Sequence, residues 1–116
     1  MPASDGTLVR GVLNGDRAAF AELYDRRARL VRAICYDETR RLQTAADLAQ
    51  EAFMRAYKNL GRLHDPDRFT FWLIGITRHV CREWRRAKGR EAWPGRADRS
   101  AAARAGSGRV AGAAAG

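Results

Sequence analysis

The chain has 116 residues, with 22 Lys+Arg against 13 Asp+Glu, a formal net charge of +9 and 46% hydrophobic residues. This length fits one domain of ordinary size, and the apolar content suffices for a globular core, which excludes a wholly disordered chain. No apolar run approaches the ~20 residues that cross a bilayer, and residues 1–10 lack the pattern of a secretory signal. Cys35 and Cys81 form no C-x-x-C, so a disulfide framework or a cysteine-rich zinc site is excluded and free thiols in a reducing cytosol are expected.

The first part of the chain predicts two helices. Residues 7–13 form a short helix that ends at Asn14 and Gly15, since this pair is a typical helix C-terminus. Asp16 suits the N-cap of a long second helix that runs to about Arg41. The apolar residues of this helix recur at intervals of three and four and therefore share one face, namely Phe20, Leu23, Tyr24, Val31, Ile34 and Cys35.

A third helix follows and carries two different faces. It opens with the capping-box-like run 44–47 and ends at Leu60, before Gly61. Its small apolar face suits close packing against another helix and comprises Ala45, Leu48, Ala49, Ala52, Phe53, Ala56 and Leu60. Its polar face comprises Asp47, Gln50, Glu51, Met54 and Lys58. The simplest interpretation of this polar face is a solvated surface, although an exposed methionine is more typical of an adaptable interface.

The fourth helix is preceded by a loop over residues 62–67. Asp65 suits an N-cap with Pro66 in the first turn, so we expect this helix from near Arg68 to about Lys88. From Gly89 onward Ala, Gly, Arg and Ser dominate, and such a segment buries too little apolar surface to offset its ordering entropy. The sequence therefore predicts an all-α fold, a compact bundle of about four helices over residues 1–88 with a disordered tail over residues 89–116.

Positive charge gathers in the second half of the chain. Residues 1–60 carry a net charge of +2 and residues 61–116 a net charge of +7, which favours a nucleic acid as partner over a membrane surface. On the fourth helix one stripe is apolar, formed by Phe69, Leu73, Ile76, Val80 and Trp84. The opposite side carries Phe71, Arg78, Arg82, Arg85 and Arg86, with Trp72 and His79 at its border. Arginines that hold phosphates beside aromatic rings that stack on bases suit unpaired nucleic acid, whereas the alternative is an ordinary solvated helix with its aromatic rings in the core.

Three motifs together resemble region 2 of the sigma-70 family, and most of all the small extracytoplasmic-function (ECF) class. The first is Gly15-Asp16-x-x-Ala19-Phe20-x-x-Leu23-Tyr24. The second is Asp47-Leu48-Ala49-Gln50-Glu51-Ala52-Phe53, followed by Arg55-Ala56-Tyr57. The third is Phe69-x-x-Trp72-Leu73-x-x-Ile76-x-Arg78. The resemblance covers roughly residues 8–88 and implies a helical domain of a bacterial transcription initiation factor.

This resemblance implies two partners, core RNA polymerase and promoter DNA. The D-x-x-Q-E face would contact the clamp helices of the largest polymerase subunit, through Asp47, Gln50, Glu51, Met54 and Arg55. The loop and last helix would recognise and melt the minus-ten element by capturing its non-template strand, through His64, Arg68, Phe71, Trp72, Arg78, His79, Arg82 and Arg85. A base taken out of the stack costs a few kcal/mol, which a preformed pocket must offset. The resemblance also allows an anti-sigma factor as partner and implies a cytoplasmic location, with no membrane partner and no cofactor.

The sequence departs from the family pattern in several places. His79 stands where many relatives have Asn, and Phe71 stands where a small hydroxyl residue is common. The loop is short, so promoter specificity does not carry over from the family. We expect no second helix-turn-helix domain (region 4) after Gly89, which leaves a truncated or frameshifted product, an isolated domain or a one-domain variant as interpretations.

Two other functional classes remain to be weighed. An enzyme is not expected, because Cys81 and His79 lie two apart and share no helix face, and the chain has no Gly-rich phosphate loop and no H-E-x-x-H metal motif. A metal site is not expected for the same reason. An interaction protein that occupies the polymerase clamp without initiating transcription is the serious alternative, and the clamp-binding face is common to both interpretations.

Overall fold

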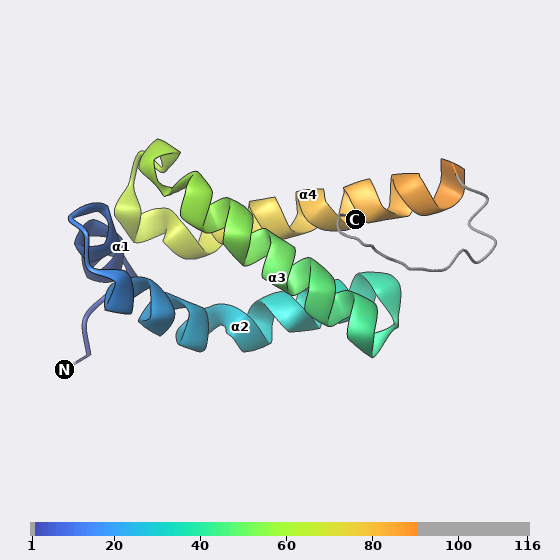
Figure 1. Ribbon diagram of the computed structural model, residues 1–116, viewed down its shortest axis with the longest axis horizontal. Helices are drawn as coiled ribbons and strands as arrows, with labels where there is room; N and C mark the ends of the chain where they lie inside the picture. The colour runs from blue at the N-terminus through green and yellow to red at the C-terminus, as the bar shows by residue number, and fades with distance from the viewer. Residues whose placement is uncertain (1, 91–116) are drawn as a thin grey trace. The chain divides into compact units, whose positions relative to one another are not determined.

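The structure is a computed structural model that describes residues 2–90. Within these residues it contains four α-helices, two 3-10 turns and no strand (Figure 1). The elements are α1 (Asp5–Leu13), α2 (Arg17–Thr39), α3 (Leu42–Lys58), η1 (Leu60–Arg62), η2 (Pro66–Arg68) and α4 (Phe69–Arg90). The predicted all-α fold of about four helices is confirmed. No helix of the described part is long and apolar enough to cross a membrane.

The chain divides into two units, residues 1–81 and residues 82–116, of which the structure describes residues 2–81 and 82–90. The first unit holds α1, α2, α3, both 3-10 turns and the first part of α4, and the last turns of α4 belong to the second unit. α4 runs through Gly89 to Arg90, so it is two residues longer than predicted. The rest of the predicted disordered tail lies outside the described residues.

The short helix α1 begins earlier than predicted. The Ser4 hydroxyl oxygen accepts a hydrogen bond from the Thr7 backbone N–H at 3.1 Å, which caps a helix that starts at Asp5 rather than at residue 7. The end of α1 at Asn14 and Gly15 is as predicted, and Gly15 has a φ of 99°, a conformation that glycine adopts without strain. Asp16 is the N-cap residue of α2, although among the described residues its side chain accepts no capping hydrogen bond.

The junction between α2 and α3 differs from the predicted one. α2 ends at Thr39, two residues before the predicted end, because Arg40 adopts the left-handed conformation with a φ of 56° and turns the chain. α3 then begins at Leu42 with Arg41 as N-cap, so the capping box predicted at Thr44 is wrong. Thr44 lies inside the first turn of α3. The chain turns at Arg40, so α3 starts at Leu42, two residues before Thr44.

The segment between α3 and α4 is largely as predicted. α3 ends at Lys58, and the 3-10 turn η1 takes up Leu60 and Gly61, which the sequence assigned to the end of the helix. Asp65 is an N-cap, since its carboxylate accepts a hydrogen bond from the Asp67 backbone N–H at 3.0 Å with Pro66 at the first position. The capped element is η2, which leads directly into α4.

The core of the first unit combines residues from all four helices. The alanines of α3 allow it to lie against α2, and Figure 1 shows the two helices crossing. The predicted apolar face of α3 is confirmed, with Leu48 partly buried and the others buried. The fully buried side chains are Phe69, Leu23, Leu60, Leu73, Val9, Val31, Thr77, Cys35 and Cys81. Tyr24, predicted on the buried face of α2, is 37% exposed and packs its ring on Phe53 at 4.6 Å between centroids.

Candidate functional site

A partly buried carboxylate on α1 joins three segments of the first unit. Asp5, whose side chain is only 12% exposed, accepts hydrogen bonds from Arg27 Nε at 3.0 Å and from Arg26 Nη1 at 3.2 Å, both on α2. It also accepts one from Thr70 Oγ1, in the first turn of α4, at 3.0 Å. Burial alone would raise the pKa of Asp5, but the hydrogen bonds from Arg27 and Thr70 outweigh it and hold the pKa below its usual value. α1 is thereby fixed to the start of α4.

The same helix also contacts the turn before α4. Gly6 is buried, and a Cβ at this position would overlap the Asp67 carboxylate of η2, so a larger residue here would require the exposed Asp67 side chain to move. Arg10 adds an ion pair with Asp67, with 3.7 Å between Nη2 and Oδ2. Through these contacts α1 holds the loop that precedes α4.

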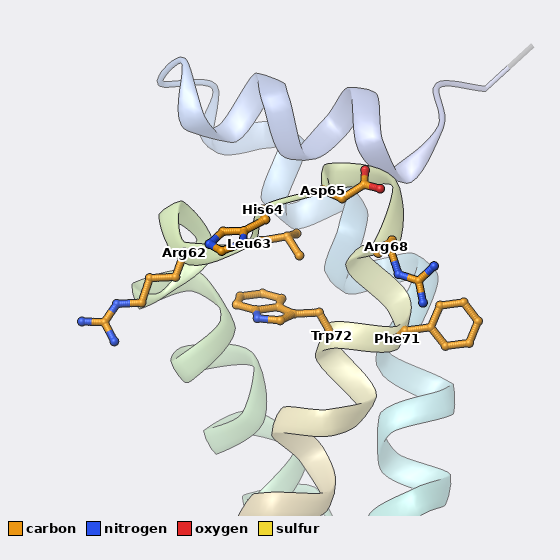
Figure 2. A pocket seen from close by; sticks show the side chains of 7 residues that line it. All are labelled: Arg62, Leu63, His64, Asp65, Arg68, Phe71 and Trp72. Atoms are coloured by element: carbon orange, nitrogen blue, oxygen red, sulfur yellow. The ribbon is translucent and has the colours of Figure 1, made fainter.

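This loop and the first turn of α4 line a hollow of about 400 Å³ that is open to solvent (Figure 2). The residues that line it are Arg62, Leu63, His64, Asp65, Arg68, Phe71 and Trp72. The side chains of Leu63 and Trp72 point toward one another, whereas Arg68 and Phe71 lie on the other side of the start of α4 (Figure 2).

The two aromatic side chains of this hollow are held differently. Trp72 is half-buried and packs on the buried Phe69 ring with 6.1 Å between centroids, so it belongs in part to the core. Phe71 is 70% exposed, and the Arg68 guanidinium lies over its ring at 5.3 Å from the centroid. An exposed phenylalanine beside an arginine offers both a stacking surface and a cation, which suits a planar anionic ligand such as a nucleotide.

The predicted cationic residues of α4 are exposed. In the first unit Arg78 and His79 face solvent, and in the second unit Arg82 and Arg85 do so. Of the eight residues predicted to contact DNA, the hollow brings four together, namely His64, Arg68, Phe71 and Trp72. The other four lie farther along α4 and do not line it.

Gly75 is a residue of this helix that sequence reasoning missed. It is exposed in the interior of α4, and a Cβ there would meet no described atom within 4 Å. Gly75 lies four residues after Phe71 and three before Arg78, so it shares their helix face. The sequence signal for this position was a glycine inside a helix, which is unfavourable by ~1 kcal/mol relative to alanine. No described atom lies close enough to exclude a larger side chain, so internal packing does not explain the glycine.

The polar face of α3 forms a second, separate surface. Asp47 and Gln50 are exposed, and Met54 is 48% exposed. Glu51 and Arg55 are half-buried and form an ion pair, with 2.7 Å between Glu51 Oε2 and Arg55 Nε. All five residues predicted on this face thus lie at the surface of one helix, with acidic, amide and thioether groups side by side.

Comparison with known proteins assigns this arrangement to one family. The family model described as Sigma-70 region 2 matches residues 23–91. The chain is 38% identical over 73 residues to the probable RNA polymerase sigma factor RfaY of Xanthomonas campestris, which covers 63% of this chain and 18% of that protein. It is 33% identical over 72 residues to the ECF RNA polymerase sigma factor SigW of Bacillus subtilis, covering 62% of this chain and 38% of the relative.

A third relative extends the match toward a larger part of the chain. The RNA polymerase sigma-H factor of Pseudomonas aeruginosa is 33% identical over 86 residues, which covers 74% of this chain and 45% of that protein. The chain therefore spans less than half the length of each of these three relatives.

Proposed function

The chain belongs to the sigma-70 region 2 family, and from this premise we propose that it binds core RNA polymerase and takes up the unpaired minus-ten strand of a promoter. The observation that carries the proposal is the hollow between the loop and α4, where aromatic and cationic side chains meet. Sigma-70 proteins are transcription factors and not enzymes, so the prediction that the chain is no enzyme is confirmed. The proposal places the chain in the cytoplasm, where RNA polymerase works.

The strand-binding part of the proposal rests on the geometry of the hollow. Trp72 presents an indole held by Phe69, and Leu63 faces it, so a flipped base would find an apolar slot without rearrangement of the core. Arg62 lies at the same hollow and can pair with a phosphate next to that base, whereas Arg68 lies beside Phe71 on the other side of the start of α4. Phe71 offers a second stacking surface on the other side of α4. Within the first unit we assign a further phosphate to Arg78, and we propose Arg82 and Arg85, both exposed in the second unit, as DNA contacts of that unit.

The polymerase-binding part rests on the polar face of α3. Asp47, Gln50 and Glu51 form a negative and amide-bearing surface on a helix that its alanine face fixes to the core. We assign the clamp helices of the largest polymerase subunit to this face, with Met54 as an adaptable apolar contact and Arg55 as the residue that orients Glu51. The acidic surface of α3 and the cationic residues of α4 would then serve partners of different charge.

Binding to unpaired DNA in the presence of polymerase tests the strand-binding proposal. The purified chain and core RNA polymerase are mixed with a labelled single-stranded oligonucleotide or the matching duplex, and retention of each is measured. We expect the complex to retain the single strand more strongly than the duplex. The variants Trp72→Ala and Arg62→Ala should reduce this preference, and Arg32→Ala, an exposed arginine of α2, is the matched control.

A melting curve accompanies each variant, because the indole of Trp72 also packs on Phe69 and its loss can unfold the domain. Arg62 is exposed, so Arg62→Ala keeps the test valid if Trp72→Ala fails to fold. Equal retention of single strand and duplex by the parent chain would contradict the proposal. Run-off transcription then separates an initiation factor from a chain that only occupies the clamp, since the latter binds polymerase and yields no transcript.

A further inference from the structure

The two cysteines of the chain meet in the core of the first unit. Cys35 on α2 and Cys81 on α4 are 46 residues apart in the sequence, and their Sγ atoms lie 3.8 Å from one another. Both side chains are buried, with exposed fractions of 0% and 1%. They are free thiols in the structure and the only cysteines of the sequence. The proposed polymerase and DNA surfaces use neither of them.

We propose that Cys35 and Cys81 are an oxidisable dithiol site, which a small hydroperoxide converts in the folded domain into an intramolecular disulfide between α2 and α4. The proposal is independent of the function assigned above, because it concerns only the thiol pair and its oxidant. It also goes beyond the free thiols expected from the sequence, since nothing in the spacing of the cysteines predicts their contact.

The geometry requires only a short movement. A disulfide has an S–S distance of about 2.05 Å, so the two sulfur atoms must approach by less than ~2 Å, which is within the reach of side-chain rotation. Forming the disulfide does not require the neighbouring hydrogen bonds to break. Thr77 is a buried polar residue one turn before Cys81, and its hydroxyl donates to the Leu73 carbonyl at 2.8 Å rather than to the thiol. Likewise Thr39 donates to the Cys35 carbonyl at 3.0 Å and leaves the Cys35 thiol untouched.

The surroundings assign different roles to the two thiols. The hydrogen bond with Cys35 lowers the pKa of Cys81, burial opposes this, and the nearby positive charge of Arg78 contributes in the same direction as the hydrogen bond. The same hydrogen bond and burial raise the pKa of Cys35. Because the thiolate is the nucleophile, we assign the first attack to Cys81, which has the positive charge of Arg78 nearby, and the second step to Cys35.

The hydroperoxide oxidises the two thiols to a disulfide in two steps. The Cys81 thiolate attacks one oxygen of the hydroperoxide, the O–O bond breaks, and the leaving oxygen takes a proton to give water or an alcohol, while Cys81 becomes a sulfenic acid. Cys35 Sγ then attacks the Cys81 sulfur, the S–O bond breaks, and the departing hydroxide takes the Cys35 proton and leaves as water. The two thiols lose two electrons, which the peroxide gains. Because both sulfur atoms are buried, a small peroxide should react faster than a bulky disulfide oxidant.

The cross-link would stabilise the domain. It closes a 46-residue segment that contains all of α3, the loop and the start of α4, and a closed loop reduces the conformational entropy of the unfolded chain. For a domain of this size we expect the midpoint of thermal unfolding, Tm, to rise by about 10 °C. The two sulfur atoms that the disulfide would join already lie 3.8 Å from one another in the folded domain.

Oxidation of the full chain tests the proposal directly. The reduced protein is treated with hydrogen peroxide, remaining thiols are alkylated, and the mass and the non-reducing peptide map are recorded. We expect a monomer that has lost two hydrogens, a peptide pair joined through Cys35 and Cys81, and a Tm that rises and returns to its starting value with dithiothreitol. Cys35→Ala and Cys81→Ala cannot form the intramolecular bond, so peroxide treatment should not raise the Tm of either variant.

The parent chain carries the decisive readout, so the test does not depend on whether the alanine variants fold. The proposal is overturned if both thiols of the folded parent stay reduced, if oxidation produces only intermolecular dimers, or if the cross-link forms only in urea. It is also overturned if the oxidised monomer melts no higher than the reduced one, since the native packing would then not accommodate the bond.

Discussion

At Gly75, helix stability and the proposed DNA binding favour different residues. Alanine at this position should stabilise α4 by ~0.5–1 kcal/mol, because it reduces the entropy of the unfolded chain and meets no described atom. If a nucleic-acid backbone passes close to α4 between Phe71 and Arg78, the added methyl group obstructs it. We expect Gly75→Ala to raise the free energy of unfolding and to weaken single-strand binding several-fold. Denaturant unfolding and an oligonucleotide titration measure the two effects, and a stabilised variant that binds like the parent would show that no close approach occurs.

Asp5 is the residue on which the position of α1 depends. Asp5→Asn removes the charge that Arg26 and Arg27 share and weakens the hydrogen bond from Thr70, at a cost of ~1–3 kcal/mol in the free energy of unfolding. The matched control is Glu22→Gln, because Glu22 pairs with the same Arg26 at 3.1 Å but is 52% exposed and should contribute less than ~0.5 kcal/mol. Urea unfolding at neutral pH compares the two variants. Equal losses would contradict the role assigned to Asp5.

The same carboxylate predicts a pH dependence. The pKa of Asp5 is lower in the folded state than in the unfolded state, so the unfolded chain binds the proton more readily. The contribution of Asp5 is therefore fully present above the unfolded pKa, near pH 4, and is lost as the pH falls through the folded value. The difference in unfolding free energy between the parent and Asp5→Asn should be constant from pH 7 to about pH 5 and shrink below about pH 4. A difference that is unchanged at low pH would contradict this.

At the scale of single helices, α3 separates stability from binding. Replacing Gln50 and Glu51 together by alanine removes one partly exposed ion pair with Arg55, which contributes at most ~0.5 kcal/mol, so Tm should barely change. If this face binds the clamp helices, affinity for core polymerase should fall about tenfold or more, because contacts at an interface centre are worth over ~1 kcal/mol. Asp37→Ala, at an exposed acidic residue of α2, is the control and should bind as the parent does. Normal binding by the double variant would rule out this surface.

α4 makes a prediction about salt. Each phosphate contact to single-stranded DNA contributes about 0.7 to the slope of log K against log salt concentration, so three to four arginines give a slope of about −2 to −3. Arg78→Ala and Arg82→Ala should each reduce the magnitude of this slope by roughly 0.7, with Arg32→Ala on α2 as the control. Fluorescence titration over a series of salt concentrations measures it. Slopes that match the parent would mean that the arginines of α4 are only solvated.

At the level of single helices, local sequence patterns predict some features of the structure and miss others. The buried face of α3 and the Asp65 cap were predicted correctly, because helical periodicity and capping chemistry depend on residues within a few positions of one another. The start of α3 was not, since Arg41 is an N-cap whose side chain gives no sequence signal and the left-handed Arg40 has no glycine to reveal it. The sequence allowed Trp72 either to stack on a base or to pack in the core. The structure supports both interpretations, because the indole packs on Phe69 and also lines the hollow.

At the scale of the first unit, the contacts that assemble the site were beyond local patterns. Periodicity indicates which side of a helix is apolar, but it does not indicate which side chains of different helices meet. The contacts of Asp5 with Arg26 and Thr70 and the contact of Cys35 with Cys81 join residues 21, 65 and 46 positions apart. The family resemblance pointed to the loop and α4 as one site, whereas the role of α1 in holding that loop became visible only in the structure.

The hydrogen bond between Asp5 and Thr70 has a consequence for the order of folding. It joins the first helix to the last across 65 positions, and contacts of such separation form slowly because the chain between them must first lose entropy. During synthesis α1 has no partner at Thr70 until all of α3 and the loop have been made. α2 and α3 can pair earlier, since they are neighbours in the chain. The contact of α1 with the start of α4 is therefore expected among the last to form, so a nascent chain can present the surface of α3 before Asp5 reaches Thr70.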